Sequence, residues 1–481
     1  MSESDQAKYQ PPVGVSAQEA LEYKSPHFDY EWFAGDAAAR NRQKVDFISG
    51  EVYVPNYDYT ILKDRTSHDS LVSGGASIDQ IAVLRGLSSV IAAESGVQAE
   101  ARDLYEDMYD TLLQRELLVE YAAKALNGGS GERRALWREK FTATNELLYG
   151  PVDANIFESL LLEKKELIVD FRPDNEAGAK IKKYVEDRLD FSSVNDETSQ
   201  ISPLDDEMIG EYRTYLSHRY APVLEVVPET DESVRYNAQD CQDIMQKALR
   251  AGGLEQKEWK VGVSDSVSGV TTSTADKTIL LPSDTSRTAK ELRALILHEQ
   301  EVHARRGQNG LESSYPGLLA NGTAKYAAVE EGLGICLEAI MNGSIEGNAA
   351  IQRAKERYLH VGLALGVDGI ERDAREVFEI TWRIKVIEIA KQNAGEINKD
   401  VIKEARAKTV PHIDNIFRGT DFAGKGVIYR KAKIYYEGFL LSAQTLSEVD
   451  RDDERFGELF LGKFDHSDNK ELGKVRRLVQ K

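Results

Sequence analysis

The chain has 481 residues, of which 81 are acidic and 61 basic, so that its net charge is −20. This charge argues against nucleic acid or an anionic membrane as a bulk partner, and no apolar run approaches the length of a membrane span. Two cysteines far apart in the sequence, Cys241 and Cys336, predict a reducing compartment and no structural disulfide. The first residues lack a basic-then-apolar signal, so we expect a cytoplasmic protein. The oligomeric state is left open.

Four regions follow from the pattern along the chain. We expect an N-terminal appendage, partly flexible, at 1–50, a helical lobe at 51–225, a core at 226–446, and a charged, peripheral tail at 447–481. Helical periodicity dominates throughout, whereas short strands cluster between about 259 and 282. The predicted class is therefore α+β, strongly helical, with one small sheet.

The most informative motif is His298-Glu299-Gln300-Glu301-Val302-His303. It resembles the HExxH zinc motif, in which both imidazoles bind the metal and the glutamate is the general base. Here the histidines are five residues apart, which on a regular α-helix turns them about 140° away from each other. Both reach one ion only if the helix carries a π-type bulge or unwinds, as helices at functional sites often do.

The flanking sequence supports such a site. Thr278–Pro282 reads as a short buried strand, preceded by a second strand at 267–272 and a turn. Thr288 and Glu291 form a capping-box pattern that predicts the start of the helix. Gly307 predicts its end just past the second histidine. The motif is thus expected on a helix beside the sheet.

A catalytic zinc site needs a third protein ligand. Downstream, Glu330 and Glu331 stand among small residues in a segment predicted to be helical, Tyr326 to Ile340. Either carboxylate could approach the first helix. The spacing alone leaves the choice between them open.

Together these motifs resemble the tyrosine carboxypeptidase-type metallopeptidases. That family includes the microtubule-associated tyrosine carboxypeptidases of animals and bacterial proteins with a QEGLA motif. Two further elements resemble it: the segment from Phe141 to Pro151, and Arg418–Asp421 followed by Lys431, Tyr435 and Gly438. The resemblance covers roughly residues 55 to 445, and HExxxH with the EEGL segment is its specific part.

The resemblance implies a predominantly helical, zincin-like metallopeptidase with a small sheet beside the metal-bearing helix. It makes His298, His303 and Glu331 the Zn²⁺ ligands and Glu299 the general base, since Glu331 aligns with the glutamate of QEGLA. The chain departs from the family in having Glu330 for Gln, Gly334 for Ala, and the additional acid Glu301. Glu330 makes the third ligand ambiguous by one position, and Glu301 would add negative charge beside the metal.

Further roles are assigned from residue type and motif position. Tyr435 is a candidate donor to the anionic intermediate, although its helical apolar surroundings fit core packing equally well. A carboxypeptidase must bind a free α-carboxylate, which suits an arginine. Arg306 is the first candidate, followed by Arg418 and Lys431, each of which has an ordinary structural interpretation as well.

The sequence thus predicts a zinc carboxypeptidase that removes a C-terminal residue from a peptide or protein. The preference for tyrosine or another aromatic residue comes from the resemblance alone. Two alternatives remain: an endopeptidase or other metal hydrolase with the same site, and a non-catalytic binding protein that kept the fold. The presence of Glu299 argues against the second alternative, because a degraded site would tolerate the loss of its base.

Overall fold

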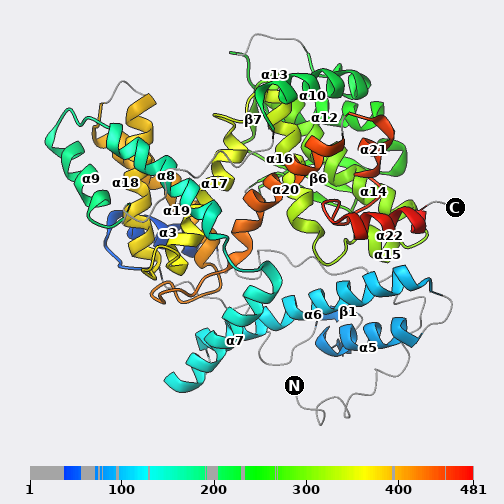
Figure 1. Cartoon of the computed structure of the whole chain (residues 1–481), viewed down its shortest axis with the longest axis horizontal. Coiled ribbons are helices and arrows are strands. Elements are labelled where there is room, and N and C mark those ends of the chain that lie inside the picture. Colours follow the sequence, from blue (N-terminus) through cyan, green and yellow to red (C-terminus); the bar gives the residue numbers. More distant parts are fainter. Residues whose placement is uncertain are drawn as a thin grey trace.

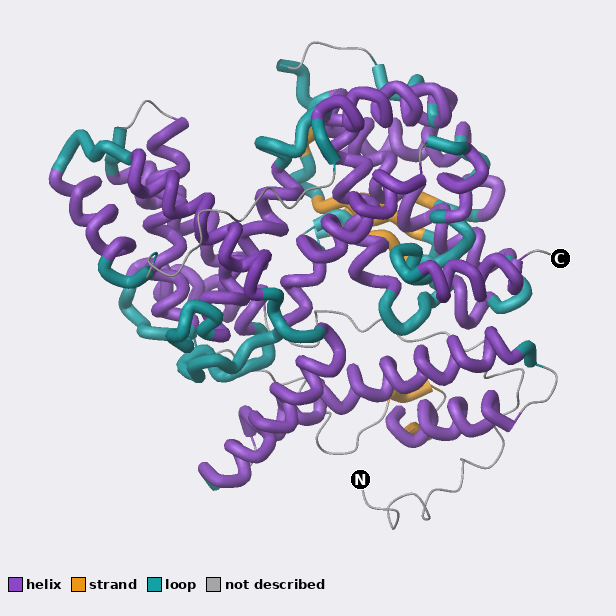
Figure 2. Tube along the Cα trace, in the orientation of Figure 1, coloured by secondary structure: helices purple, strands orange, loops and turns teal. Residues whose placement is uncertain are grey.

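The computed structural model describes most of the chain from residue 37 onward. The described ranges are 37–55, 71–73, 76–78, 80–93, 97–127, 130–189, 191, 204–228, 233–265, 267, 269–392, 396–449 and 451–479, so most of the predicted appendage lies outside them. Within them the protein is mostly helical with small sheets, in agreement with the predicted α+β class (Figure 2). None of the described helices is long and apolar enough to cross a membrane.

The helices form three groups around a central crossing (Figure 1). The first group contains α3 (Ala37–Ser49), α8 (Ala154–Asp170), α9 (Glu176–Glu186), α17 (Ala349–Leu365), α18 (Ala374–Gln392) and α19 (Lys399–Phe417). The second contains α5 (Gln80–Ala93), the long α6 (Ala99–Asn127) and α7 (Gly131–Tyr149), with the separate strand pair β1 (Leu71–Ser73) and β2 (Ala76–Ile78).

The third group surrounds the small sheet and carries the predicted site. Its helices before the histidine motif are α10 (Asp206–Arg219), α11 (Ala221–Leu224), α12 (Ala238–Ala251), η2 (Glu255–Lys257) and α13 (Ala289–Leu295). The motif itself lies on η3 (Ile296–Ala304). After it come α14 (Arg305–Glu312), α15 (Pro316–Leu319), α16 (Tyr326–Asn342), α20 (Ile434–Val449), α21 (Asp453–Glu458) and α22 (Asn469–Val479). The short η4 (Arg430–Lys433), directly before α20, instead contacts α17 and α19 of the first group.

These groups do not follow the predicted boundary at residue 225. One continuous apolar cluster joins Phe157 and Leu216, from the predicted N-terminal lobe, to Leu333 and Ile387 of the predicted core. Segments on both sides of the boundary therefore bury each other's apolar surface.

The sheet has the order β4-β6-β5. β4 (Lys260–Ser264) runs parallel to the central β6 (Thr278–Pro282), and β5 (Thr271–Ser273) runs antiparallel to it. A second, two-stranded pair joins β3 (Tyr236–Asn237) to β7 (Ser286–Arg287), directly before α13. Among the described strands, β5 pairs with β6 alone, so the sheet presents an edge at β5, next to η3.

Two glycines let α16 cross α20 at very short range. A Cβ at Gly332 would lie 2.0 Å from the backbone of Gly438, and a Cβ at Gly438 would lie 1.8 Å from the carbonyl oxygen of Ala328. Only residues without a side chain allow the two backbones to meet in this way. The crossing fixes the position of α16, and with it the glutamates that α16 carries.

The C-terminal tail is not peripheral, contrary to the prediction. Phe464 and Val475 are fully buried in an apolar cluster that also contains Leu104 of α6. The backbone carbonyls of Gly462 and Phe464 accept hydrogen bonds from the buried Arg306, just beyond the histidine motif. The apolar residues of this segment hold the second and third helix groups together, and its Lys463 is buried beside Glu330.

Candidate metal centre

The predicted distortion of the motif helix is present. The capping box is formed: Glu291 N donates to Thr288 Oγ1 at 3.2 Å and Thr288 N donates to Glu291 Oε2 at 2.8 Å. α13 then continues into η3, a π-helix over Ile296–Ala304. The wider π turn places residues five apart on the same side, and the ring centroids of His298 and His303 are 5.0 Å apart.

Glu331 of α16 completes a group that could hold a metal. The potential ligand atoms of His298, His303 and Glu331 all lie within 4.8 Å of one another. Among the described residues, this is the group of His, Cys, Asp or Glu side chains that is close enough to hold a metal ion. Two imidazoles and one carboxylate form the donor set of many catalytic zinc sites, with a further position left for water. The residue types and their spacing therefore fit Zn²⁺.

Glu330, the other candidate, faces the opposite side of His303. Its Oε1 lies 2.8 Å from His303 Nδ1, and it also meets Arg306 Nη1 at 3.3 Å and Lys463 Nζ at 3.2 Å. Burial would raise the pKa of Glu330, but Lys463, His303 and Arg306 hold it at about 2. Glu330 is thus an ionised carboxylate that orients a histidine ring.

Glu338 contacts the other histidine in the same way and was not among the predicted site residues. Its Oε1 lies 3.2 Å from His298 Nδ1. Burial lowers the pKa of His298, but Glu338 and the nearby Glu299 and Glu331 raise it to about 9. In both rings Nδ1 thus faces a carboxylate, which leaves Nε2 for a metal. The sequence could have indicated Glu338 through its spacing of seven residues from Glu331, because two helical turns return to the same face of the helix.

Gly334 lies between these two glutamates on the face of α16 that meets η3. A Cβ at this position would be 2.7 Å from the imidazole of His298. Glycine at position 334, where the family has alanine, therefore makes room for the histidine ring. The His298 ring occupies the space that an alanine methyl group would need.

Glu299 is buried and held by the edge strand. Thr272 Oγ1 on β5 donates to Glu299 Oε2 at 2.6 Å. This contact holds the carboxylate of Glu299, the residue after His298, against β5. Thr272 was not predicted as a site residue, because nothing in its local sequence distinguishes it from other strand threonines.

Glu301 does not bring an unbalanced charge to the site. It is buried, and its carboxylate accepts hydrogen bonds from Gln300 Nε2 at 2.8 Å and from Arg305 Nε at 3.2 Å. Arg305 also donates to the carbonyl oxygen of Gly252 after α12. The charge of Glu301 is therefore neutralised by a cation one turn away.

Arg306 is placed where it cannot bind a substrate carboxylate, which corrects the prediction. Its side chain is fully buried. Nε donates to Gly462 O at 2.9 Å, Nη2 to Phe464 O at 2.6 Å, and Nη1 to Glu330 Oε2 at 3.3 Å. The guanidinium is thus enclosed by backbone carbonyls and by the carboxylate that orients His303.

The other predicted residues, Arg418, Lys431 and Tyr435, lie on elements other than η3 and α16. Arg418 follows the last residue of α19, where Nη2 donates to Asn415 Oδ1 at 3.2 Å and lies 3.9 Å from Asp414. Lys431 is part of η4. Tyr435 is half-buried in the first turn of α20, with the guanidinium of Arg357 4.7 Å from its ring centroid.

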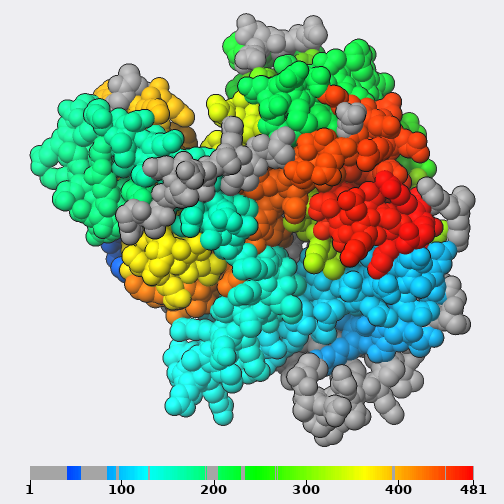
Figure 3. All heavy atoms as spheres, in the orientation of Figure 1, coloured from blue at the N-terminus to red at the C-terminus, as the bar shows by residue number. Residues whose placement is uncertain are grey.

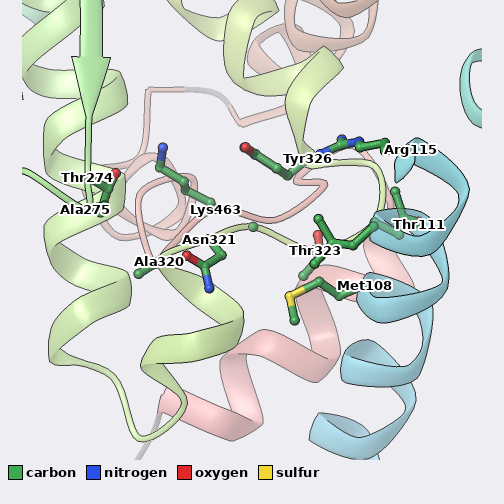
Figure 4. A pocket seen from close by; sticks show the side chains of 13 residues that line it. Met108, Thr111, Arg115, Thr274, Ala275, Ala320, Asn321, Thr323, Tyr326 and Lys463 are labelled. Atoms are coloured by element: carbon green, nitrogen blue, oxygen red, sulfur yellow. The ribbon is translucent and has the colours of Figure 1, made fainter. Parts of the chain in front are cut away.

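A small polar pocket lies between α6 and the third helix group (Figure 4). Its volume is about 90 Å³, and Thr274 and Lys463 line one side while Met108 and Arg115 of α6 line the other. Thr274 Oγ1 is buried without a hydrogen-bond partner among the described residues. Lys463 also contacts Glu330, the carboxylate that faces His303 Nδ1. Lys463 therefore connects this pocket to the metal group.

Comparison with known proteins gives one match. The model of the family described as microtubule-associated tyrosine carboxypeptidase matches residues 210–358. No curated protein and no solved structure matches the chain. The elements at 141–151 and 418–438 lie outside the matched range, whereas the histidine motif and the three glutamates of α16 lie inside it. Over residues 210–358, the resemblance to the microtubule-associated tyrosine carboxypeptidase family that the motifs predicted is thereby confirmed.

Proposed function

We propose that this protein is a zinc-dependent carboxypeptidase that hydrolyses the C-terminal peptide bond of a peptide or protein. The observation that carries the proposal is the grouping of His298, His303 and Glu331 next to Glu299 and an open strand edge. The family match supports the reaction class. A preference for a C-terminal tyrosine rests on that match alone.

The residues of the chain divide the work of such a reaction. Zn²⁺ held by His298, His303 and Glu331 would polarise the scissile carbonyl and lower the pKa of bound water to about 7. Glu299, held by Thr272, accepts the proton of the attacking water and delivers it to the leaving amine. The peptide lies antiparallel along β5, whose outer edge offers backbone hydrogen-bonding groups.

Tyr435 remains our candidate donor to the oxygen of the tetrahedral intermediate. Its position at the start of α20, beside Arg357, and its partial burial support a fixed phenol group. Tyr435→Phe keeps the ring and removes only the hydroxyl. A loss in kcat of about tenfold or more with unchanged zinc content supports the role, whereas wild-type kcat contradicts it.

The experiment that tests the proposal combines metal content with turnover. Purified wild-type protein should contain about one zinc per chain and release one residue from peptides with a free C-terminus. Glu299→Gln should keep the zinc and lose turnover, whereas His298→Ala should lose both. Cleavage inside amidated peptides at the same rate would identify an endopeptidase. Full zinc content without any cleavage would favour a non-catalytic binding protein.

A further inference from the structure

Arg353 on α17 has the properties of a cation that is kept available for a ligand. Its side chain is exposed, and it forms no hydrogen bond or ion pair with any described residue. Arg357, four residues later, lies on the same face of α17 and stacks on Tyr435. Its Nε is buried without a hydrogen-bond partner among the described residues. Like charges on one helix face repel each other unless an anion is added.

Arg287 of β7 extends this group, which we call the arginine cluster (Arg287, Arg353 and Arg357). The positive charges of Arg287 and Arg357 act on Arg353, and the negative charge of Glu338 opposes them. Both Arg353 and Arg287 in turn act on Glu338, whose Oε1 lies 3.2 Å from His298 Nδ1. The arginine cluster therefore borders the His298 side of the metal group.

The space-filling view is hollowed in this part of the molecule. A depression opens between the teal surface of the first helix group and the green surface that includes α10 (Figure 3). Yellow-green atoms, the colour of the segment that contains α16 and α17, are visible at its floor.

The direction of a bound peptide follows from the open edge of β5. Antiparallel addition, the more stable pairing, places the C-terminal side of the peptide near the beginning of β5. There Thr271 pairs with Leu280, close to the end of β6, from which the chain continues to Arg287. The opposite end of β5 leads to Thr274 and the pocket that contains Arg115. The C-terminus of the peptide therefore points towards the end of β6, from which the chain leads to Arg287 of the arginine cluster.

We infer that Arg353 binds the free α-carboxylate of the substrate, with Arg287 and Arg357 providing additional positive charge. This inference rests on the proposed function and supplies the carboxylate-binding residue that Arg306 does not. A guanidinium binds a carboxylate through two parallel hydrogen bonds, so a terminal carboxylate is preferred to a neutral terminal amide. Arg353 acts here as a specificity-determining residue.

The test measures peptide binding without turnover. In the Glu299→Gln protein loaded with zinc, the dissociation constants of one peptide are measured as free acid and as C-terminal amide. We expect the acid to bind about ten- to a hundredfold more tightly, the range of a charge-assisted hydrogen bond. Adding Arg353→Ala should abolish this preference by weakening only the acid, and Arg353→Lys should restore part of it.

A matched control is Arg115→Ala, which removes a cation at the other end of β5 and should leave the acid preference unchanged. Zinc content and thermal unfolding establish that each variant is folded. The inference is overturned if Arg353→Ala keeps the full preference, or if Arg115→Ala loses it. Failure of the proposed function looks different: the wild-type protein would release no C-terminal residue, and the Glu299→Gln protein would bind acid and amide equally.

Discussion

Glu330 Oε1 lies 2.8 Å from His303 Nδ1, while the next residue, Glu331, joins the metal-competent group. Adjacent residues on an α-helix point about 100° apart, so the two neighbouring carboxylates point in different directions. Glu331→Ala should therefore abolish zinc binding. Glu330→Gln should retain one zinc per chain with affinity weakened about ten- to a hundredfold. Zinc stoichiometry and competition with a chelator measure both effects, and the reverse result would make Glu330 the ligand.

Gly334→Ala should disturb the centre although it adds only one methyl group. The new Cβ would lie 2.7 Å from the His298 ring, so the ring or α16 must shift. We expect a loss of unfolding free energy of about 1–3 kcal/mol together with weaker zinc binding. Gly210→Ala on α10 is the matched control, because a Cβ there meets nothing within 4 Å. Equal denaturation midpoints for the two variants would contradict the close packing of His298 on Gly334.

Zinc affinity should depend on pH through His298. Its pKa is raised to about 9 by Glu338 and neighbouring carboxylates, so the metal-free protein carries a proton there at neutral pH. Zinc must displace this proton, and the apparent affinity should therefore rise as pH increases towards about 9. Glu338→Gln removes the main group that raises this pKa, so the dependence should become shallower above pH 7. An affinity that is flat between pH 6 and 9 in the wild-type protein would disprove this coupling.

The same proton affects stability when the metal is absent. The folded-state pKa of His298 lies above its ordinary value of 6.5. Protonated His298 therefore adds to the free energy of unfolding below about pH 6.5, and this stabilisation is lost as the pH rises through 9. We expect the metal-free protein to lose up to about 3 kcal/mol of unfolding free energy over this range. The zinc-bound protein should not show this loss. Urea unfolding of both forms at several pH values makes the comparison.

Thr272→Val should lower kcat without removing the metal. The substitution keeps the shape of the side chain but deletes the 2.6 Å hydrogen bond to Glu299. A less firmly positioned base should reduce kcat about tenfold, with little change in KM. Thr271→Val, in the adjacent and more exposed position of β5, is the control. Identical kcat values for both variants would show that Thr272 does not position the base.

Arg306→Ala should damage the fold rather than substrate recognition. It removes a buried guanidinium that binds Gly462, Phe464 and Glu330, and it leaves the Glu330 carboxylate with fewer partners. Loss of one partner of a buried pair costs about 3–5 kcal/mol, so the urea midpoint should fall markedly. For the fraction that remains folded, KM for peptides with a free carboxylate should change little. A large rise in KM with unchanged stability would restore Arg306 as a substrate-binding residue.

Local sequence signals predicted several features that the structure contains. The capping box at Thr288 and Glu291, the strands before it, and the helix distortion required by the HExxxH spacing are all present. Each depends on residues within about five positions of one another, where propensity and spacing act directly. Residue types alone also limited the possible third ligand to Glu330 or Glu331.

Other features depend on contacts between distant segments. Glu338 supports His298 because α16 crosses η3, and Lys463 reaches Glu330 because the C-terminal segment folds back against the core. Nothing in the sequence near Arg306 or Arg353 distinguishes the buried arginine from the exposed one. The sequence by itself therefore determined the chemistry of the candidate metal-binding residues and the local distortion that brings the histidines together. Only the tertiary structure decided which charges are enclosed and which remain open to a substrate, because burial and ion pairing depend on how segments hundreds of residues apart pack together.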